Sequence, residues 1–134
     1  MRYELKSLQE TRDWAAQFAQ TLRAPRVVAL HGDLGMGKSE IARAVIQTLS
    51  GADTVVPSPT FTLVQNYDGI SHFDLYRVRD AAELEEIGLA ESCSRDICLI
   101  EWPEIALGFL PPDTIHIYIS EINGGRELTI GPRR

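Results

Sequence analysis

The spacing of apolar side chains predicts a helix close to the start of the chain. Ser7 and Glu10 stand three residues apart, which is the spacing of a capping box at a helix start. An apolar side chain then recurs at every fourth residue, at Trp14, Phe18 and Leu22, so these three would share one side of the helix. A short strand is expected just before this helix, and Pro25 would stop the helix.

A buried strand and a second helix are expected next, with a glycine-rich stretch between them. Residues 27–30 read Val-Val-Ala-Leu, an unbroken apolar run that is typical of a strand covered on both faces. Over about residues 38–49, Ile41, Val45 and Leu49 recur with the period of a helix, and a glycine follows that would end it. The order strand, glycine-rich turn, helix indicates an α/β protein.

Two pairs of segments have the pattern of β-hairpins. Residues 62–67 and 70–76 flank an Asp-Gly pair, which is the strongest short hairpin signal in the chain. Residues 114–119 and 127–130 flank an Asn-Gly-Gly turn in the same way. Because hairpins pair their strands antiparallel whereas strand–helix–strand units pair them parallel, the predicted sheet is mixed.

The remaining segments predict one short helix and one more buried strand. The helix is expected over residues 80–87, capped by Asp80, and the strand over residues 97–100, a second unbroken apolar run. The prolines after that strand indicate loop. A length of 134 residues suits one compact unit, so we expect a single α/β domain that spans residues 1–134.

The composition is that of an acidic, cytoplasmic protein. The formal net charge is −6, and a negative surface repels phosphate backbones, so direct binding to DNA or RNA is not expected without a local basic patch or a partner. Cys93 and Cys98 are too few for a disulfide framework or a cysteine-rich zinc site, so reduced thiols are expected. The N-terminus lacks the apolar segment of a signal peptide, and no apolar run approaches the ~18 residues of a membrane span.

The glycine-rich stretch fits the pattern of a phosphate-binding P-loop. Residues Gly32–Ser39 read Gly-Asp-Leu-Gly-Met-Gly-Lys-Ser, which matches G-x-x-x-x-G-K-[ST]. The glycines let backbone N–H groups approach phosphate oxygens, and the following helix presents its positive N-terminus to them. The Lys38 ammonium would bridge the β- and γ-phosphates, and the Ser39 hydroxyl would ligate Mg²⁺. The sequence therefore predicts a site for a nucleoside triphosphate with Mg²⁺.

An acidic residue at the end of a neighbouring strand is the expected second ligand of the metal. Glu101 directly follows the apolar run at residues 97–100, which makes it the candidate, either for Mg²⁺ or for its bound water. The alternative is an exposed glutamate where a strand meets a loop. Trp102 follows at once and is predicted either to pack near the nucleotide or to belong to the core.

The segment His72-Phe73-Asp74-Leu75-Tyr76 is a candidate wall of the site. If it is a strand, Phe73 and Leu75 point into the core while the three polar residues share the opposite face. Asp74 could then order a metal-bound or an attacking water, although a solvated face is the alternative. A transition-metal site on His72 and Asp74 is not expected, because two ligands do not close one.

A proline-rich loop at residues 57–60 offers a sensor for the γ-phosphate. Two prolines stiffen this Pro-Ser-Pro-Thr segment and present Ser58 and Thr60, whose hydroxyls could respond to the phosphate as switch segments of GTPases do. An ordinary turn is the alternative. His31 and His116 are expected to be structural.

Taken together, four segments of the chain resemble the TsaE family. Members of this family are small bacterial P-loop ATPases that support threonylcarbamoyladenosine modification of tRNA. The order of the segments, their spacing and the chain length all fit the family. The segments are GDLGMGKS (32–39), SPTFTLV (58–64), HFDLYR (72–77) and IEWPE (100–104).

This resemblance implies a fold, a cofactor, partners and site residues. The fold would be a P-loop NTPase-like αβα sandwich, the cofactor ATP with Mg²⁺, and the partners two larger proteins called TsaB and TsaD, through which tRNA is reached only indirectly. Ser39 and Glu101 would hold Mg²⁺, while Asp74 and Thr60 would serve hydrolysis or its coupling. The residues implied near ATP are Gln9, Glu10, Thr11, Leu34, Gly35, Met36, Gly37, Lys38, Ser39 and Arg126.

The chain departs from the usual family pattern in two places. Glu40 follows the P-loop where many relatives have threonine, and its negative charge is expected to weaken phosphate binding or slow turnover. After Glu104 the usual glycine-containing turn is replaced by Ile-Ala-Leu, so a different local loop is expected there.

Three functions are compatible with these motifs. The first is an ATPase subunit that acts on a protein complex, with weak activity alone. The second is a small-molecule kinase, for which Arg77 and Arg79 could serve, although no insertion is long enough for a lid domain. The third is a nucleotide-binding regulator with negligible turnover, because a P-loop indicates binding rather than hydrolysis and no arginine finger is evident. The N-K-x-D signature of many GTPases is absent from the sequence, and the resemblance favours ATP.

Overall fold

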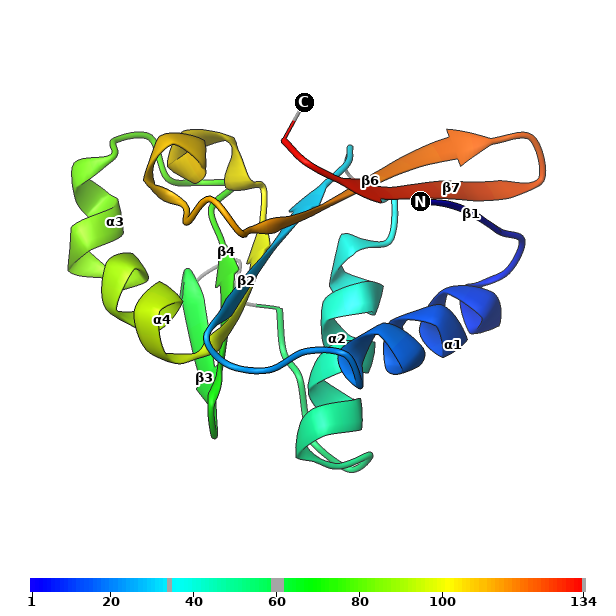
Figure 1. Ribbon diagram of the computed structural model, residues 1–134, viewed down its shortest axis with the longest axis horizontal. Coiled ribbons are helices and arrows are strands. Elements are labelled where there is room, and N and C mark those ends of the chain that lie inside the picture. The colour runs from blue at the N-terminus through cyan, green and yellow to red at the C-terminus, as the bar shows by residue number, and fades with distance from the viewer. Residues whose placement is uncertain (34, 59–61, 134) are drawn as a thin grey trace.

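The computed structural model describes residues 1–33, 35–58 and 62–133, which form one sheet with helices on both of its faces (Figure 1). In chain order the elements are β1 (Arg2–Leu5), α1 (Leu8–Ala19), β2 (Arg26–His31), α2 (Lys38–Ser50), β3 (Val64–Tyr67), β4 (Ile70–Asp74), α3 (Ala82–Glu86), α4 (Leu89–Arg95), β5 (Ile97–Glu101), the 3₁₀ helix η1 (Pro103–Phe109), β6 (Ile115–Ile122) and β7 (Gly125–Gly131). None of the helices in these ranges is long and apolar enough to cross a membrane.

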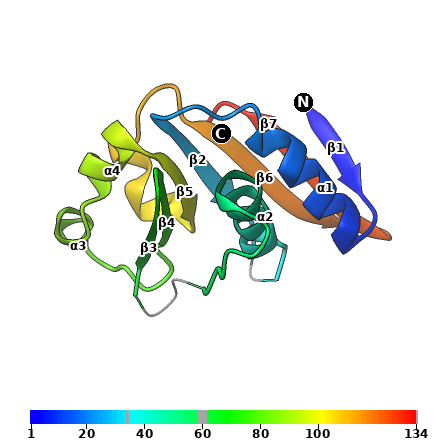
Figure 2. The ribbon, with the colours of Figure 1, turned by 90° about the horizontal axis from the view of Figure 1, so that it is seen from below.

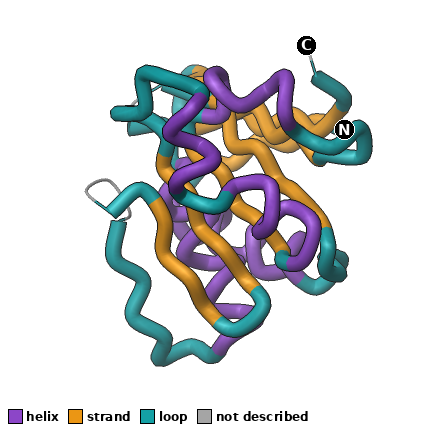
Figure 3. The backbone as a smooth tube through the Cα atoms, turned by 90° about the vertical axis from the view of Figure 1, so that its left-hand side faces the viewer, coloured by secondary structure: helices purple, strands orange, loops and turns teal. Residues whose placement is uncertain are grey.

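The sheet is mixed, as the sequence predicts. Its strand order is β1-β7-β6-β2-β5-β4-β3. The central strands β6, β2, β5 and β4 run parallel, while β3 and the pair β7–β1 are joined antiparallel at the two edges. Both predicted hairpins are present, as β3–β4 and β6–β7. The two chain ends lie close together because β1 pairs with β7, and the Met1 amino group donates to the Ile130 carbonyl at 2.9 Å (Figure 3).

Two apolar cores lie on opposite faces of this sheet. On β2, Val28 and Leu30 pack toward α1 and α2, whereas Val27 packs toward α3, α4 and η1. Figure 2 shows the strands between these two helical layers. Strands covered on both faces need unbroken apolar sequence, which explains the runs in β2 and β5. The αβα arrangement implied by the family resemblance is therefore confirmed.

Helix α1 begins where the capping pattern places it but ends earlier than the sequence suggests. The backbone N–H of Glu10 donates to the Ser7 hydroxyl at 3.1 Å, and the rings of Trp14 and Phe18 stack at 5.0 Å between centroids. The helix ends at Ala19, well before the proline expected to stop it. The chain there tightens into a turn with bonds to carbonyls three residues back, which still buries Leu22.

The structure corrects three further expectations. Leu49 lies on the last turn of α2 and is 38% exposed, so the apolar stripe of that helix ends at Val45 and Ile46. The sequence does not predict helix α4, which follows Gly88, a residue in a left-handed conformation. It does not predict η1 either, because the prolines there indicated loop. Both are short and lack a full amphipathic repeat, so their conformation depends on packing against the sheet.

The two cysteines lie together under α4. Cys93 on α4 and Cys98 on β5 are both buried and both free thiols, in agreement with the expectation from their number. The hydrogen bond between the two thiols, together with burial, raises the pKa of Cys98, so that thiol stays protonated.

Candidate functional site

The parallel strands bring the predicted site residues to one edge of the sheet. Leu30 of β2 and Asp74 of β4 both lie opposite Glu101 of β5, so the carboxyl ends of three strands meet there. The P-loop leaves β2 at the same edge, because it directly follows His31. This edge is where ligands bind in open α/β sheets.

Two positions of the P-loop require glycine, one for its backbone conformation and one for lack of space. Gly37, the N-cap of α2, has φ of +105°, a left-handed value that costs a side chain energy. At Gly32 a Cβ atom would lie 2.9 Å from the carbonyl oxygen of Ile119, so β6 leaves no room for one. These two positions turn the chain so that α2 starts at Lys38, with its N-terminus at the sheet edge.

The Lys38 side chain is folded back onto its own loop. Its ammonium donates to the carbonyl oxygens of Gly32 and Asp33, the latter at 2.9 Å, and lies 3.9 Å from the centroid of the Trp102 ring. Burial lowers the pKa of Lys38, and nearby carboxylates, above all Glu101, oppose that shift. A phosphate group would therefore replace backbone carbonyls as the acceptor of this ammonium.

A chain of hydrogen bonds joins α2, β5 and β4. The Ser39 hydroxyl donates to Oε1 of Glu101 at 2.9 Å, and the other carboxylate oxygen lies 2.6 Å from Nε2 of His72. Glu101 is 2% exposed, so it is a buried carboxylate rather than an exposed one at a strand end. The alternation of polar residues on β4 predicts the face on which His72 lies, but not its contact with Glu101, which depends on β4 lying next to β5.

Ser39 and Glu101 suit a magnesium ion by their chemistry and spacing. Both offer oxygen ligands, which Mg²⁺ prefers, and two ligands side by side on Mg²⁺ lie about 3 Å apart. The Ser39–Glu101 oxygen separation of 2.9 Å agrees with that spacing. Among the described residues no group of three or more His, Cys, Asp or Glu side chains could enclose a metal, so phosphate oxygens and water would have to supply the other ligands.

The β4 segment has the two faces that the sequence predicts. Phe73 and Leu75 belong to the core below α3 and α4, and His72 and Asp74 lie on the opposite side. Both polar side chains are buried, at 2% and 6% exposed, so the face is not simply solvated. The strand ends at Asp74, whose Oδ1 accepts from the Tyr76 N–H at 3.0 Å, and Tyr76 itself is exposed.

Trp102 covers the P-loop lysine in an unusual backbone conformation. Its φ is +56°, a left-handed value that is strained for an aromatic residue. Its ring lies 4.7 Å from the ring of Tyr76, between centroids, and also contacts the Lys38 ammonium. Trp102 is half-buried, so of the two sequence interpretations the structure favours packing at the site edge.

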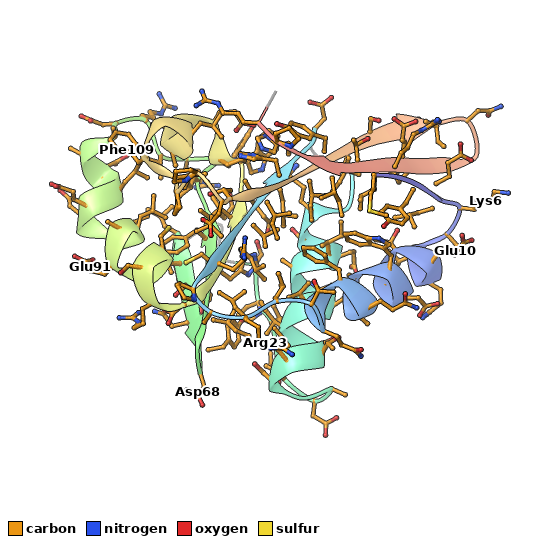
Figure 4. All side chains as sticks on the ribbon, viewed as in Figure 1. Lys6, Glu10, Arg23, Asp68, Glu91 and Phe109 are labelled. Carbon is orange, nitrogen blue, oxygen red and sulfur yellow. The ribbon has the colours of Figure 1, made fainter. Side chains whose placement is uncertain are left out.

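A cavity of 510 Å³ adjoins the P-loop between the start of α1 and the β6–β7 hairpin. Thr11 and Arg126 line it together with Gly35, Met36 and Gly37, so these residues lie beside the P-loop, and their role at a nucleotide stays a prediction. Gln9 instead lines a separate groove between α1 and α2, and the Glu10 side chain is exposed at the outer end of α1 (Figure 4). A role for these last two residues at the nucleotide stays a prediction.

Glu40 is balanced by two arginines. Its carboxylate pairs with Arg43 at 2.7 Å and with Arg12 of α1 at 3.4 Å. These cations offset the negative charge of Glu40, which was expected to weaken phosphate binding.

Two other predicted site residues, Leu34 and Thr60, lie outside the described residues.

Comparison with known proteins identifies similar sequences over nearly the whole chain. The family model described as "Threonylcarbamoyl adenosine biosynthesis protein TsaE" matches residues 5–128. A protein of Rickettsia bellii named "tRNA threonylcarbamoyladenosine biosynthesis protein TsaE" is 39% identical over 92% of this chain and 89% of its own length. Proteins of the same name from Haemophilus influenzae and Treponema pallidum are 41% and 33% identical, over 78% and 97% of this chain and 68% and 99% of their own lengths.

A solved structure has the same fold. "Crystal structure of Bacillus subtilus YdiB" superposes with a TM-score of 0.80 at 26% sequence identity. The match covers 97% of this chain and 83% of that chain. The helices and strands are thus arranged as in a protein of known structure.

Proposed function

The chain belongs to the TsaE family, a family of P-loop ATPases, and on this premise we propose that it binds and hydrolyses ATP in support of threonylcarbamoyladenosine modification of tRNA. The observation that carries the proposal is the meeting of Lys38, Ser39 and Glu101 at the carboxyl edge of the sheet. Nucleotide hydrolysis needs a cation that binds the phosphates, together with a hydroxyl and a carboxylate that bind a metal.

Each residue has a role in this proposal. Lys38 binds the β- and γ-phosphates, and Ser39 and Glu101 hold Mg²⁺, which neutralises charge on the phosphate oxygens. Asp74 orients the attacking water from the next strand, with Thr60 as its assistant. The cavity lined by Thr11 and Arg126 receives the rest of the nucleotide, and Trp102 packs at its phosphate end.

Partner proteins complete the proposed function. A net charge of −6 disfavours direct contact with tRNA, so tRNA is reached through a complex with TsaB-like and TsaD-like proteins in the cytoplasm. The folded-back Lys38 supports weak activity of the isolated chain, because the ammonium must leave two carbonyl acceptors before it can hold phosphate.

Phosphate release measured with and without the two partners tests this proposal. The expected result is slow Mg²⁺-dependent release by the protein alone, a higher rate with TsaB-like and TsaD-like proteins together, and loss of both rates in Lys38→Ala. Equal and negligible rates with and without partners, at concentrations where ATP is bound, would contradict hydrolysis. That outcome would favour the second candidate, a nucleotide-binding regulator, which the closed arrangement of Lys38 under Trp102 also suits.

A further inference from the structure

His72 is a buried histidine whose ring contacts the carboxylate proposed to hold the metal. Nε2 of His72 lies 2.6 Å from Oε2 of Glu101, and the two side chains are only 2% and 3% exposed. Oε1 of the same carboxylate accepts from the Ser39 hydroxyl at 2.9 Å. One oxygen of Glu101 is thus used on the side of β4 and the other on the side of α2.

We propose that His72 is a positioning residue for the magnesium site, which holds the Glu101 carboxylate so that Oε1 faces Ser39. This inference rests on the proposed function, because it concerns the ligand set of the same site. In this proposal His72 acts through Glu101, as outer-shell hydrogen bonds commonly orient metal ligands.

The register of the sheet explains why this residue can do so. His72 lies opposite Leu99 and Asp74 opposite Glu101 on the neighbouring parallel strand, so His72 and Glu101 are diagonal neighbours on one face. Strand backbones fix both Cα atoms, and burial leaves the two side chains little freedom. The carboxylate therefore has one preferred orientation before any metal arrives.

The contacts of the His72 ring indicate which of its two nitrogens carries hydrogen. A carboxylate that ligates Mg²⁺ must be ionised and can then only accept, so in this proposal Nε2 of His72 donates to Glu101. Nδ1 of His72 is buried and has no hydrogen-bond partner among the described residues. A proton on Nδ1 would leave a buried donor unsatisfied, whereas a bare Nδ1 leaves only an acceptor. The structure thus calls for the tautomer with hydrogen on Nε2.

Two substitutions separate this donor role from simple packing. In His72→Gln the amide nitrogen can take the place of Nε2 and still donate to Glu101. In His72→Asn the shorter amide reaches only about as far as Nδ1 and loses the contact. Both variants remove the ring and keep a polar side chain, so each serves as the control for the other.

Calorimetry of ATP binding across a series of Mg²⁺ concentrations provides the main test. His72→Asn should need ~10- to 100-fold more Mg²⁺ than the wild type for the same gain in ATP affinity, because the loss of an outer-shell hydrogen bond typically weakens metal binding by that factor. His72→Gln should stay close to the wild type, and metal-free ATP affinity should be similar in all three proteins. An unchanged Mg²⁺ requirement in folded His72→Asn, or equal losses in both variants, would overturn the positioning role.

A second measurement keeps the inference testable if a variant does not fold. The ¹⁵N chemical shifts of the His72 ring in the wild-type protein report which nitrogen carries hydrogen, without nucleotide or metal. Hydrogen on Nε2 is expected, and a ring with hydrogen on Nδ1 alone would overturn the donor role of Nε2 toward Glu101. If the wild type shows no Mg²⁺-dependent ATP binding, the proposed function fails, while the ring shifts still decide the contact by themselves.

Discussion

Lys38 donates to the loop that is expected to cradle phosphate. Gly32 and Asp33 supply its acceptors, and Trp102 covers it from the other side. Burial lowers the pKa of this lysine, so its ammonium form is already less stable than in water. A triphosphate, which offers charged oxygens, would therefore satisfy the ammonium better than neutral carbonyls do.

Replacing Lys38 tests this argument directly. Lys38→Ala should weaken Mg-ATP binding about 10- to 100-fold, because a hydrogen bond to a charged group contributes about 1.5–3 kcal/mol. Calorimetry gives the affinity. Arg23→Ala is the matched control, since it removes an exposed positive charge from the loop before β2, at the opposite end of that strand (Figure 4). An affinity kept in Lys38→Ala would refute the phosphate role of this side chain.

Trp102 should report the release of Lys38. The chain has two tryptophans, so in Trp14→Phe all tryptophan emission comes from Trp102. Mg-ATP should change that emission because phosphate draws the ammonium away from the indole ring, now 3.9 Å from its centroid. Fluorescence titration measures the change, and adenosine, which lacks phosphates, should leave it small. Emission that responds equally to both ligands would contradict this account.

At this scale the sequence predicts residue types better than contacts. The P-loop pattern identifies Lys38 and Ser39, because phosphate chemistry demands those groups at those positions. It cannot show that Lys38 bends back to carbonyls, since this depends on loop conformation. Nor can it show that His72 reaches Glu101, because that contact requires the strand order and register, which place β4 next to β5.

Among the elements, α1 depends most visibly on a local signal. The Ser7 hydroxyl accepts from the Glu10 N–H at 3.1 Å and so satisfies one of the free donors of the first turn. The same turn supplies Thr11 to the cavity beside the P-loop. The cap therefore supports both the helix and one wall of the candidate site.

Removing the cap should destabilise the protein modestly. Ser7→Ala is expected to lower the free energy of unfolding by about 1 kcal/mol, the usual loss for an N-cap. Urea unfolding followed by circular dichroism measures it. Ser50→Ala, at the exposed last position of α2, is the control and should change stability by less than about 0.5 kcal/mol. Equal effects of the two substitutions would argue against the cap.

Local signals predict the long elements and fail for the short ones. Capping and apolar periodicity define α1 and α2, and turn residues define both hairpins. Helix α4 instead follows Gly88 and η1 follows Trp102, and these two preceding residues have left-handed backbone conformations. Neither helix is long enough for an amphipathic repeat, so both depend on packing against the sheet. The early end of α1 has the same origin, because the turn after Ala19 returns the chain to β2.

At the scale of the molecule, the mixed sheet places titratable groups between distant segments. His116 of β6 lies 2.9 Å, nitrogen to nitrogen, from His31, the residue before the P-loop. Burial, and next the charge of Arg133, lower the pKa of His116 below its ordinary value. The unfolded chain therefore takes up a proton at this position at higher pH than the folded protein does.

Stability should consequently fall in acid in part through His116. Below about pH 6.5, the ordinary histidine pKa, protonation favours the unfolded state, so the free energy of unfolding decreases as the pH falls. His116→Asn keeps a polar atom near the position of Nδ1 but cannot titrate, so it should lose less stability between neutral and acidic pH. Urea unfolding over that range measures both proteins. Parallel pH profiles would contradict the role of this residue.

The pairing of β1 with β7 also sets an order of events during protein synthesis. β1 leaves the ribosome before β7, yet the Met1 amino group bonds to Ile130, 129 residues away. Until β7 emerges, the N-terminal strand has no neighbour, and the wall that contains Arg126 is missing from the cavity. A chain that stops before residue 125 would thus leave β6 as an open sheet edge, to which strands of other chains can pair.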